Sequence, residues 1–437
     1  MRSSKIYVRF STIFLCLFLI SIGAIIQATT PEAAVKKLNY TAKHHTPSPE
    51  EKAFYNTKRQ ELQLAVKKYF KKAIASGAIV GAGVSIVRND SILLNDGFGR
   101  RNFNLDKKVD GETIFRLGSL SKGFTGVLAS KIKNEGKLDW DDKVSDFIPG
   151  FQLGNQANSD NITLGTILSH TSGTPYHSYT NLVEAGLPLT DIAKRFKNVT
   201  PISTPGEMYS YQNAMFALSS EMMYIATGED IATSLENNFF KPLEMCSTNM
   251  SHESLMKNKN VAIPHAPRKN GWRTLKLRNS YYNAIAAGGI NSSATDMAKW
   301  MQFLLGYHPE VMKESAIQEV FQPVIEIKGH NKYYHRWPGH LTSYYAYGWR
   351  IHKYSEENSK EEKTIWHHGG SVNNFRNEIA LFPEDKLGIC VLFNSANKVS
   401  RTVIPDLKKI IREIYNTSIE DLSLEKSDHA SLVETEN

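Results

Sequence analysis

The sequence is poor in cysteine. Only three of its 437 residues are cysteines, and only Cys246 and Cys390 lie beyond the N-terminal segment. This count excludes a fold that depends on several disulfides, and it leaves a single bridge between these two thiols open. No repeat period is visible along the chain. With 41% apolar residues, a chain of this length can bury a large core, as an ordinary globular protein does.

The sequence also lacks a concentration of charge of one sign. Lysine and arginine number 52 against 44 aspartates and glutamates, which gives a formal net charge of +8. The basic residues are scattered and form no single stripe, whereas a surface that binds nucleic acid gathers them on one face. We therefore expect no nucleic-acid partner.

Two catalytic signatures are missing. No serine is framed by Gly-x-Ser-x-Gly, so a Ser-His-Asp triad on an α/β-hydrolase fold is set aside. His367 and His368 are adjacent, and neighbouring side chains of a strand point to opposite faces, so the two could not easily bind one ion. No carboxylate or cysteine cluster accompanies them. We expect neither a metal site nor another cofactor.

The N-terminal segment differs from the rest of the chain. Arg2, Lys5 and Arg9 precede an uncharged, mostly apolar run at residues 11–28, which is typical of an export signal. We favour cleavage near Ala28, but 18 residues are also at the short edge of what spans a bilayer. Residues 1–28 are therefore predicted to be a signal peptide or a membrane anchor. We expect an exported, periplasmic or cell-envelope protein, which an uncleaved anchor would attach to the membrane.

The rest of the chain divides by composition. From composition we predict a polar linker at residues 29–55, a folded domain at residues 56–417 and a disordered tail at residues 418–437. Two hairpins are predicted near the ends of this domain, at residues 78–94 and 377–393. The long middle is rich in helical patterns. We therefore expect the α/β (α+β) class: one antiparallel sheet formed from both chain ends and flanked by helices, with an inserted, mainly helical lobe and a cleft between the lobes.

Two helical stripes stand out in that middle. Apolar residues recur at helical spacing from 120 to 132, so a helix should begin just after Gly118. A second stripe, at residues 297–305, follows the capping candidates Ser293 and Asp296.

Ser119 and Lys122 stand at the start of the first helix, at positions i and i+3 of one face. If Lys122 is partly buried its pKa falls, and the neutral amine can accept the proton of Ser119. Ser-x-x-Lys also occurs at Ser130, Ser254, Ser395 and Ser423. Ser119 differs from these by its context, because it follows a strand-like segment and a glycine that permits a tight turn. Ser119 is therefore the predicted nucleophile.

The segment 115–122 (FRLGSLSK) resembles the active-site segment of the serine β-lactamase and penicillin-binding protein family. Further segments resemble family signatures in the same order, at residues 97–99, 135–142, 162–173, 287–297 and 347–349. The resemblance covers roughly residues 56–415 and is strongest to class C β-lactamases, DD-peptidases and family esterases. It implies a β-lactamase/transpeptidase-like fold in which Ser119 is acylated.

Residues 205–213 (PGEMYSYQN) resemble the Tyr-x-Asn element of this family with its leading Pro-Gly. The resemblance implies that Tyr211, with a pKa lowered by Lys122, is a general base for Ser119 and later returns the proton to the leaving group. Asn213 would orient Lys122 and a substrate amide. Two other Tyr-x-Asn triplets, which begin at Tyr179 and Tyr281, lack the leader.

Residues 366–371 (WHHGGS) resemble the strand that carries Lys-Thr-Gly in class C β-lactamases and His-x-Gly in related peptidases and esterases. By this alignment His368 takes the position of the lysine and contacts substrate, and Gly370 lets the substrate backbone approach closely. The amide of Ser371 would pair with that of Ser119 as an oxyanion hole. A neutral imidazole disfavours efficient β-lactam hydrolysis, but it can still hydrogen-bond a substrate carboxylate or the Tyr211 phenol.

The resemblance implies a serine hydrolase that forms a covalent acyl-enzyme with peptide-like, D-amino-acid or ester substrates, either small molecules or peptidoglycan-like peptides. Two alternatives stay open: a class C-type β-lactamase, and a non-catalytic penicillin-binding or scaffold protein that has kept the fold. The four polar groups of Ser119, Lys122, Tyr211 and Asn213 argue against the non-catalytic alternative, because a protein without the reaction has no chemical need of them. The oligomeric state stays open.

Overall fold

The structure is a computed structural model, which describes residues 49–416 except 330 and 358. The predicted export segment 1–28, most of the predicted linker 29–55 and the predicted tail 418–437 lie outside the described residues. In the part of the chain that the structure describes, no helix is both long and apolar enough to cross a membrane. The elements below belong to the unit that begins at Glu51, apart from the first two residues of helix α2.

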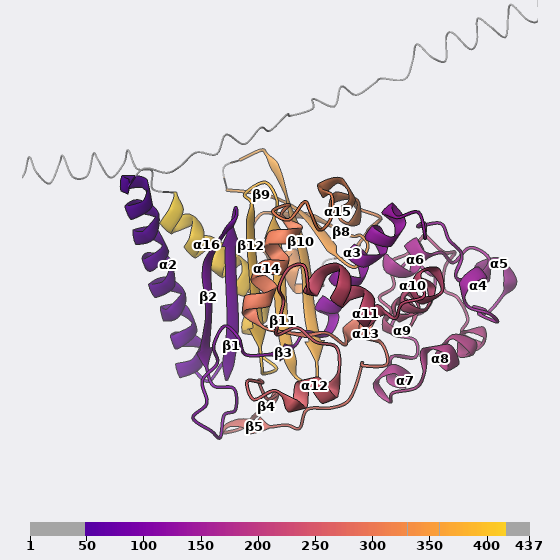
Figure 1. Ribbon diagram of the computed structural model, residues 1–437, viewed down its shortest axis with the longest axis horizontal. Helices are drawn as coiled ribbons and strands as arrows, with labels where there is room; N and C mark the ends of the chain where they lie inside the picture. The colour runs from indigo at the N-terminus through magenta and orange to yellow at the C-terminus, as the bar shows by residue number, and fades with distance from the viewer. Residues whose placement is uncertain (1–48, 330, 358, 417–437) are drawn as a thin grey trace, which may run out of the picture. The chain divides into compact units, whose positions relative to one another are not determined.

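An eight-stranded antiparallel sheet organises this unit, with the strand order β2-β1-β12-β11-β10-β9-β8-β7 (Figure 1). Its strands are β1 Gly81–Arg88, β2 Ser91–Gly99, β7 Ile325–Glu326, β8 His340–Tyr345, β9 Arg350–Ser355, β10 Glu362–Val372, β11 Phe375–Phe382 and β12 Leu387–Phe393. Strand β1 pairs with β2 on one side and with β12 on the other. The prediction of one sheet built from both ends of the domain is therefore confirmed.

Both predicted hairpins are confirmed. Strands β1 and β2 are joined at Asn89, whose φ of 54° lies in the left-handed region that asparagine tolerates. Strands β11 and β12 pair in register up to Phe382 and Leu387, which flank the second turn. Two short pairs stand apart from the large sheet: β3 Phe115–Arg116 with β6 Asn291–Ser292, and β4 His265–Arg268 with β5 Gly271–Thr274.

Side chains of the central strands alternate between two apolar layers. In β12, Ile389, Val391 and Phe393 pack on the face that helices α2 and α16 cover. Cys390 and Leu392 point to the opposite face, toward α3 and α14. Because helices cover both faces (Figure 1), the central strands are buried on both sides and read as continuous apolar runs.

The inserted segment between β2 and β7 is mainly helical, as predicted. The α-helices of the described chain are α2 Pro49–Ala75, α3 Ser121–Asn134, α4 Val144–Phe147, α5 Gln156–Ser159, α6 Leu164–Leu168, α7 Thr180–Glu184, α8 Leu189–Arg195, α9 Asn213–Ala217, α10 Ser219–Thr227, α11 Ile231–Leu235, α12 His252–Lys257, α13 Ile285–Gly288, α14 Ala294–Leu304, α15 Glu314–Val320 and α16 Val403–Tyr415. Helical turns that are not α-helical are η1 Gly118–Leu120, η2 Phe196–Asn198, η3 Glu236–Phe240, η4 Tyr333–Arg336 and η5 Val399–Arg401.

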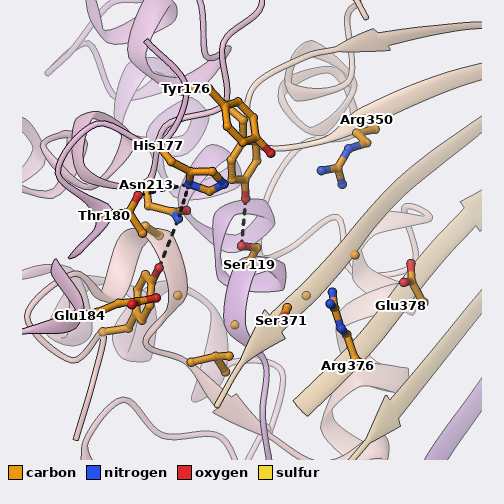
Figure 2. A pocket seen from close by; sticks show the side chains of 18 of the residues that line it. Ser119, Tyr176, His177, Thr180, Glu184, Asn213, Arg350, Ser371, Arg376 and Glu378 are labelled. Atoms are coloured by element: carbon orange, nitrogen blue, oxygen red, sulfur yellow. Dashed lines mark hydrogen bonds between the residues drawn. The ribbon is translucent and has the colours of Figure 1, made fainter. Parts of the chain in front are cut away.

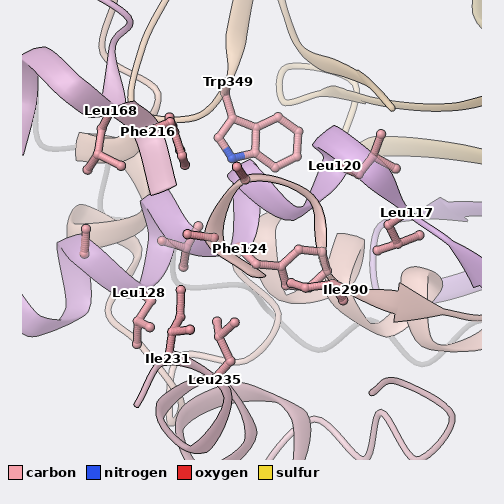
Figure 3. Packing of buried hydrophobic residues seen from close by; sticks show 14 of the residues in the cluster. Leu117, Leu120, Phe124, Leu128, Leu168, Phe216, Ile231, Leu235, Ile290 and Trp349 are labelled. Carbon is pink, nitrogen blue, oxygen red and sulfur yellow. The ribbon is translucent and has the colours of Figure 1, made fainter. Parts of the chain in front are cut away.

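Helix α3 lies at the centre of the larger apolar cluster (Figure 3). Phe124 stacks on Trp300 of α14, with ring centroids 4.1 Å apart. Trp349 lies against Gly123, where an added Cβ would be 2.6 Å from the indole. The apolar stripe predicted at residues 120–132 is therefore confirmed as core. Its packing holds the start of α3 in place.

Three details refine the sequence expectations. Helix α2 begins at Pro49, within the segment 29–55 that the sequence predicts as a linker. Ser293 caps α14 by accepting the amide hydrogen of Asp296, whereas the Asp296 carboxylate accepts the Ser247 amide instead. Cys246 and Cys390 are both free thiols.

Candidate active site

The backbone around Ser119 is shaped by a glycine. Strand β3 leads into the turn η1, and Gly118 there has a φ of 58°. A Cβ at Gly118 would lie 2.9 Å from the backbone of Ser371, so the position needs glycine for its conformation and for its space. Ser119 and the end of β10 are thereby held together.

Strand β10 presents a free edge beside Ser119. Strand β9 pairs with β10 only from Glu362 to His367, so within residues 49–416 the structure pairs no strand with the following residues of β10 on that side. A Cβ at Gly370 would lie 2.1 Å from the carbonyl oxygen of Leu117, which shows how closely the two segments approach. Gly370 and Ser371 line a pocket together with Ser119. The two serine amides thus lie on adjacent stretches of backbone.

Lys122 is fully buried in the first turn of α3, three residues after Ser119. Its Nζ donates to Asn213 Oδ1 at 2.7 Å and to the Ala287 carbonyl at 2.8 Å, and it lies 3.4 Å from Ser119 Oγ. Burial, with a smaller effect of Arg350, holds the pKa of Lys122 well below its usual value. A neutral amine has two N–H groups and one lone pair. The two N–H groups have partners, and the lone pair is left for the hydroxyl of Ser119.

Tyr211 contacts the other side of the Ser119 hydroxyl. Its phenol donates a hydrogen bond to Ser119 Oγ at 2.9 Å. The expectation that Lys122 lowers the pKa of Tyr211 is wrong. Burial raises this pKa to about 12, Arg350 and the bond to Ser119 oppose the rise, and Lys122 is not among the groups that shift it. Tyr211 is therefore a proton donor in the resting site.

Asn213 opens helix α9 and links the lysine to the pocket wall. Its Oδ1 accepts from Lys122, and its Nδ2 donates to the phenol of Tyr281 at 3.2 Å. The same Nδ2 lies 3.5 Å from His177 Nδ1. Tyr281, which begins a triplet without the family leader, nevertheless lines the pocket.

His368 lies on β10, as the alignment with the Lys-Thr-Gly strand implies, but its side chain does not reach the pocket as expected. It is fully buried, its Nε2 lies 2.9 Å from the Tyr345 phenol, and its Nδ1 faces the carbonyl of Gly369 at 2.8 Å. It is not among the residues that line the pocket. Burial and the nearby Arg350 hold its pKa well below the usual value, so the ring is neutral. The expected contact of His368 with substrate is therefore replaced by a contact with Tyr345.

A cation that the sequence reasoning missed enters the pocket from β9. Arg350 lines the pocket, and its guanidinium lies 5.9 Å from the ring centroid of Tyr211 and 5.8 Å from that of Tyr345. Its Nε is buried, and no residue that the structure describes accepts a hydrogen bond from it. The signal in the sequence was the Tyr-Gly-Trp segment at 347–349, which directly precedes Arg350.

The pocket has a volume of about 470 Å³ and two chemically different sides. Figure 2 shows Arg350, Arg376 and Glu378 on the strand side of Ser119. Thr180 and Glu184 lie on the opposite side. The described residues hold no group of three or more His, Cys, Asp or Glu side chains that could bind a metal ion.

Comparison with known proteins agrees with this architecture. The fold is similar to that of the octameric penicillin-binding protein homologue from Pyrococcus abyssi, with a TM-score of 0.67 and 23% identity over 79% of this chain and 77% of that one. The sequence profile of the Beta-lactamase family matches residues 66–411. The chain belongs to the Beta-lactamase family, and the expected fold is confirmed.

Individual relatives are distant. Protein flp of Staphylococcus aureus strain COL is 25% identical over 341 residues, which cover 78% of this chain and 64% of that protein. Unguisins hydrolase ungD' of Aspergillus campestris is 28% identical over 295 residues, which cover 65% of this chain and 52% of that protein. The chain therefore spans less than two thirds of the length of these curated relatives.

Proposed function

We propose that the chain is a serine hydrolase that works through a covalent acyl-enzyme on Ser119. The observation that carries this proposal is the position of Ser119 Oγ, 2.9 Å from a phenol that donates to it and 3.4 Å from a buried amine. An unperturbed lysine is charged near neutral pH and cannot accept a proton. The burial of Lys122 removes this obstacle.

The reaction follows from these contacts. The Ser119 hydroxyl passes its proton to Lys122 Nζ while Oγ bonds to the substrate carbonyl carbon. The oxyanion lies between the amides of Ser119 and Ser371. The bond to the leaving group then breaks, and the leaving group takes up the proton with Tyr211 as the group that passes it on. Water attacks the acyl ester next, gives its proton to Lys122, and Ser119 Oγ leaves with a proton.

The charges of the pocket favour substrates with a carboxylate in the leaving group. Arg350 and Arg376 lie on the strand side of Ser119, and an arginine binds a carboxylate through two N–H groups. The free edge of β10 fits an extended, peptide-like substrate. We therefore favour peptide-like and D-amino-acid substrates, with simple esters as weaker ones. The name of the fungal relative, a hydrolase, supports hydrolysis as the reaction class.

The place of action is the cell envelope. The basic and apolar N-terminal residues 1–28 support export, so peptidoglycan-like peptides are substrates that the enzyme would meet there. A class C-type β-lactamase is the second candidate, favoured by the family match. A β-lactam also carries a carboxylate, for which Arg350 supplies the cation that His368 does not.

Covalent labelling tests the nucleophile. Intact protein is incubated with a fluorescent penicillin or a fluorophosphonate and weighed by mass spectrometry. We expect one adduct on the wild type and none on Ser119→Ala. Ser254→Ala is the matched control, because Ser254 and Lys257 have the same spacing on exposed α12. Labelling that persists in Ser119→Ala would refute the assignment, and no labelling by either probe would favour the non-catalytic alternative.

Substrate preference is tested on the same protein. Turnover of a chromogenic cephalosporin is compared with that of p-nitrophenyl esters and of D-alanyl peptides. We expect the peptides and esters to be cleaved faster than the cephalosporin. Fast cephalosporin turnover with negligible cleavage of the others would establish the β-lactamase alternative instead.

A further inference from the structure

A chain of hydrogen-bonded side chains runs through the sheet and ends at the pocket. Glu378 Oε2 lies 2.8 Å from His367 Nε2, and His367 Nδ1 lies 3.0 Å from His352 Nε2. His352 Nδ1 lies 2.8 Å from Ser343 Oγ, which lies 2.7 Å from His340 Nε2. The chain crosses β11, β10, β9 and β8, and the mechanism proposed above uses none of its members.

A glycine opens the pocket to the end of this chain. A Cβ at Gly369 would lie 2.8 Å from the Tyr333 phenol and 3.1 Å from Glu378 Oε2. With no side chain at this position, both groups line the pocket beside the free edge of β10. Tyr333 donates a hydrogen bond to Glu378 Oε2 at 2.7 Å. The Glu378 carboxyl is thus 4% exposed, yet it borders the space that a leaving group would occupy.

All hydrogen bonds of this side-chain chain can form with either of two directions of donation. If Glu378 is neutral, its O–H donates to His367 Nε2, and each later link donates outward until Ser343 donates to His340. If Glu378 is ionised, each link reverses, from His340 as donor to Ser343 through to His367 as donor to Glu378. Both directions use neutral imidazoles, and burial holds the pKa values of His352 and His367 well below the usual value. When Glu378 ionises, one proton moves outward along each link, and His340, which gains a proton on Nε2, releases the one on Nδ1 to solvent, so one proton leaves the chain in total.

Several charged and titratable groups face the Glu378 carboxyl. They are Tyr333 from η4, Arg350 from β9, His367 from β10, Arg376 from β11 itself and Cys390 from β12. Burial raises the pKa of Glu378 to about 8, although Tyr333, Arg350 and Arg376 act to lower it. Among the described residues, the basic side chain within 4.0 Å of the Glu378 carboxyl is the neutral imidazole of His367, at 2.8 Å, and neither arginine pairs with it. Glu378 is therefore neutral at pH 7, and both guanidinium groups keep their full charge for a ligand.

We propose that Glu378 sets the charge of the active-site pocket, so that the neutral carboxyl admits a substrate carboxylate to Arg350 and Arg376 and the ionised carboxyl repels it. This proposal rests on the proposed function for its substrate class. The histidine chain makes the two states equally well hydrogen-bonded, so the switch leaves no buried polar group without a partner. Glu378 is a specificity-determining residue, while Ser119 and Lys122 carry the reaction.

The tautomers of the histidines test the chain without any substrate. The full-length protein, labelled with ¹⁵N in histidine, is titrated from pH 6.5 to 9.5, and the ring nitrogens are followed by NMR. We expect His367 and His352 to exchange their protonated nitrogens together, with one midpoint near pH 8. In Glu378→Gln the amide donates to His367 at every pH, so both rings should stay fixed. Fixed rings in the wild type, or a transition that survives in Glu378→Gln, would overturn the coupling.

Matched substrates test the consequence for specificity. One is an acyl thioester whose leaving group ends in a carboxylate, and the other carries a carboxamide there. We divide kcat/KM for the carboxylate-ended thioester by kcat/KM for the carboxamide-ended one. We expect this ratio to fall about tenfold between pH 7 and 9.5, because ionised Glu378 adds one negative charge several ångströms from the substrate carboxylate. The ratio should stay constant in Glu378→Gln and fall as in the wild type in Glu361→Gln, which removes an exposed carboxylate beside β10. A ratio independent of pH in the wild type would overturn the proposal.

The two experiments separate this proposal from the proposed function. If Ser119 is not acylated and neither thioester is cleaved, the hydrolase assignment fails, and the NMR titration still decides whether Glu378 and the histidines switch together. If both thioesters are cleaved with the same pH profile, the hydrolase assignment stands and the charge-setting role of Glu378 is refuted. If Glu378→Gln does not fold, the NMR titration and the pH dependence of the substrate ratio in the wild type still decide both questions.

Discussion

Lys122 offers the sharpest perturbation of the site. Lys122→Met keeps the length and much of the volume of the side chain but removes the amine that accepts the Ser119 proton. We expect the rate of acylation to fall about 10²- to 10⁴-fold, the range that a positioned general base contributes. The Tyr211 phenol does not replace it, because its pKa of about 12 keeps it protonated and its hydrogen already points to Ser119.

The same substitution has a predictable cost in stability. Lys122 Nζ donates to Asn213 Oδ1 and to the carbonyl of Ala287, and both acceptors are buried. A methionine leaves both without a donor, at about 1–3 kcal/mol each, and the loss is offset in part because the methionine needs no desolvation. We therefore expect a modest decrease in the free energy of unfolding, measured by urea denaturation. A folded Lys122→Met variant then isolates the chemical effect.

Stopped-flow measurement of labelling by a fluorescent penicillin gives the acylation rate. The matched control is Lys257→Met, which removes the exposed lysine of the Ser-x-x-Lys pair at Ser254 and its contact with Glu253 at 2.6 Å. This control should label at the wild-type rate, with a stability change within about 0.5 kcal/mol. Acylation of Lys122→Met at the wild-type rate would refute the role of Lys122 as base.

Three further outcomes follow from the geometry. Gly118→Ala forces a Cβ into a left-handed residue against the Ser371 backbone, so labelling should be slow and unfolding should require less urea. In steady-state assays, Arg350→Gln should raise KM for a carboxylate-ended thioester about tenfold or more and leave KM for the carboxamide analogue unchanged. Equal effects on both substrates would contradict the binding of the substrate carboxylate by Arg350. Because the pKa of Lys122 is lower in the folded than in the unfolded protein, the unfolded state binds more protons, and stability should rise with pH between these two pKa values. Urea titrations should show this rise in the wild type and a smaller one in Lys122→Met.

Local patterns were enough to predict the sheet and the nucleophile segment. Period-two apolar runs around the turn at Asn89 gave the first hairpin, and the helical stripe after Gly118 placed Ser119 at a helix start. The grouping of Lys122, Tyr211 and Asn213 depended on the family resemblance, because these residues lie up to 91 positions apart in the chain. Spacing alone carries no information on such contacts.

The remaining features depend on strand register and burial. Arg350 reaches the pocket because β9 pairs it with His367, and Glu378 does so because Gly369, its partner in β10, has no side chain. Arg350 directly follows the Tyr-Gly-Trp segment, but that segment does not show which way the arginine points, and Glu378 lies in no motif with a local signature. The error over His368 has the same origin, since its partner Tyr345 comes from β8. The direction of the Tyr211 pKa was missed because the degree of burial is not visible in the sequence.

Location of the acyl group tests the central claim most directly. The protein is labelled with a penicillin and digested with trypsin, which cuts after Arg116 and Lys122 and releases residues 117–122. This peptide also contains Ser121, whose buried hydroxyl accepts the Ile290 amide, so fragmentation must separate the two serines. We expect the adduct mass on Ser119. An adduct on Ser121 or on any other peptide would contradict the assignment of Ser119 as the nucleophile.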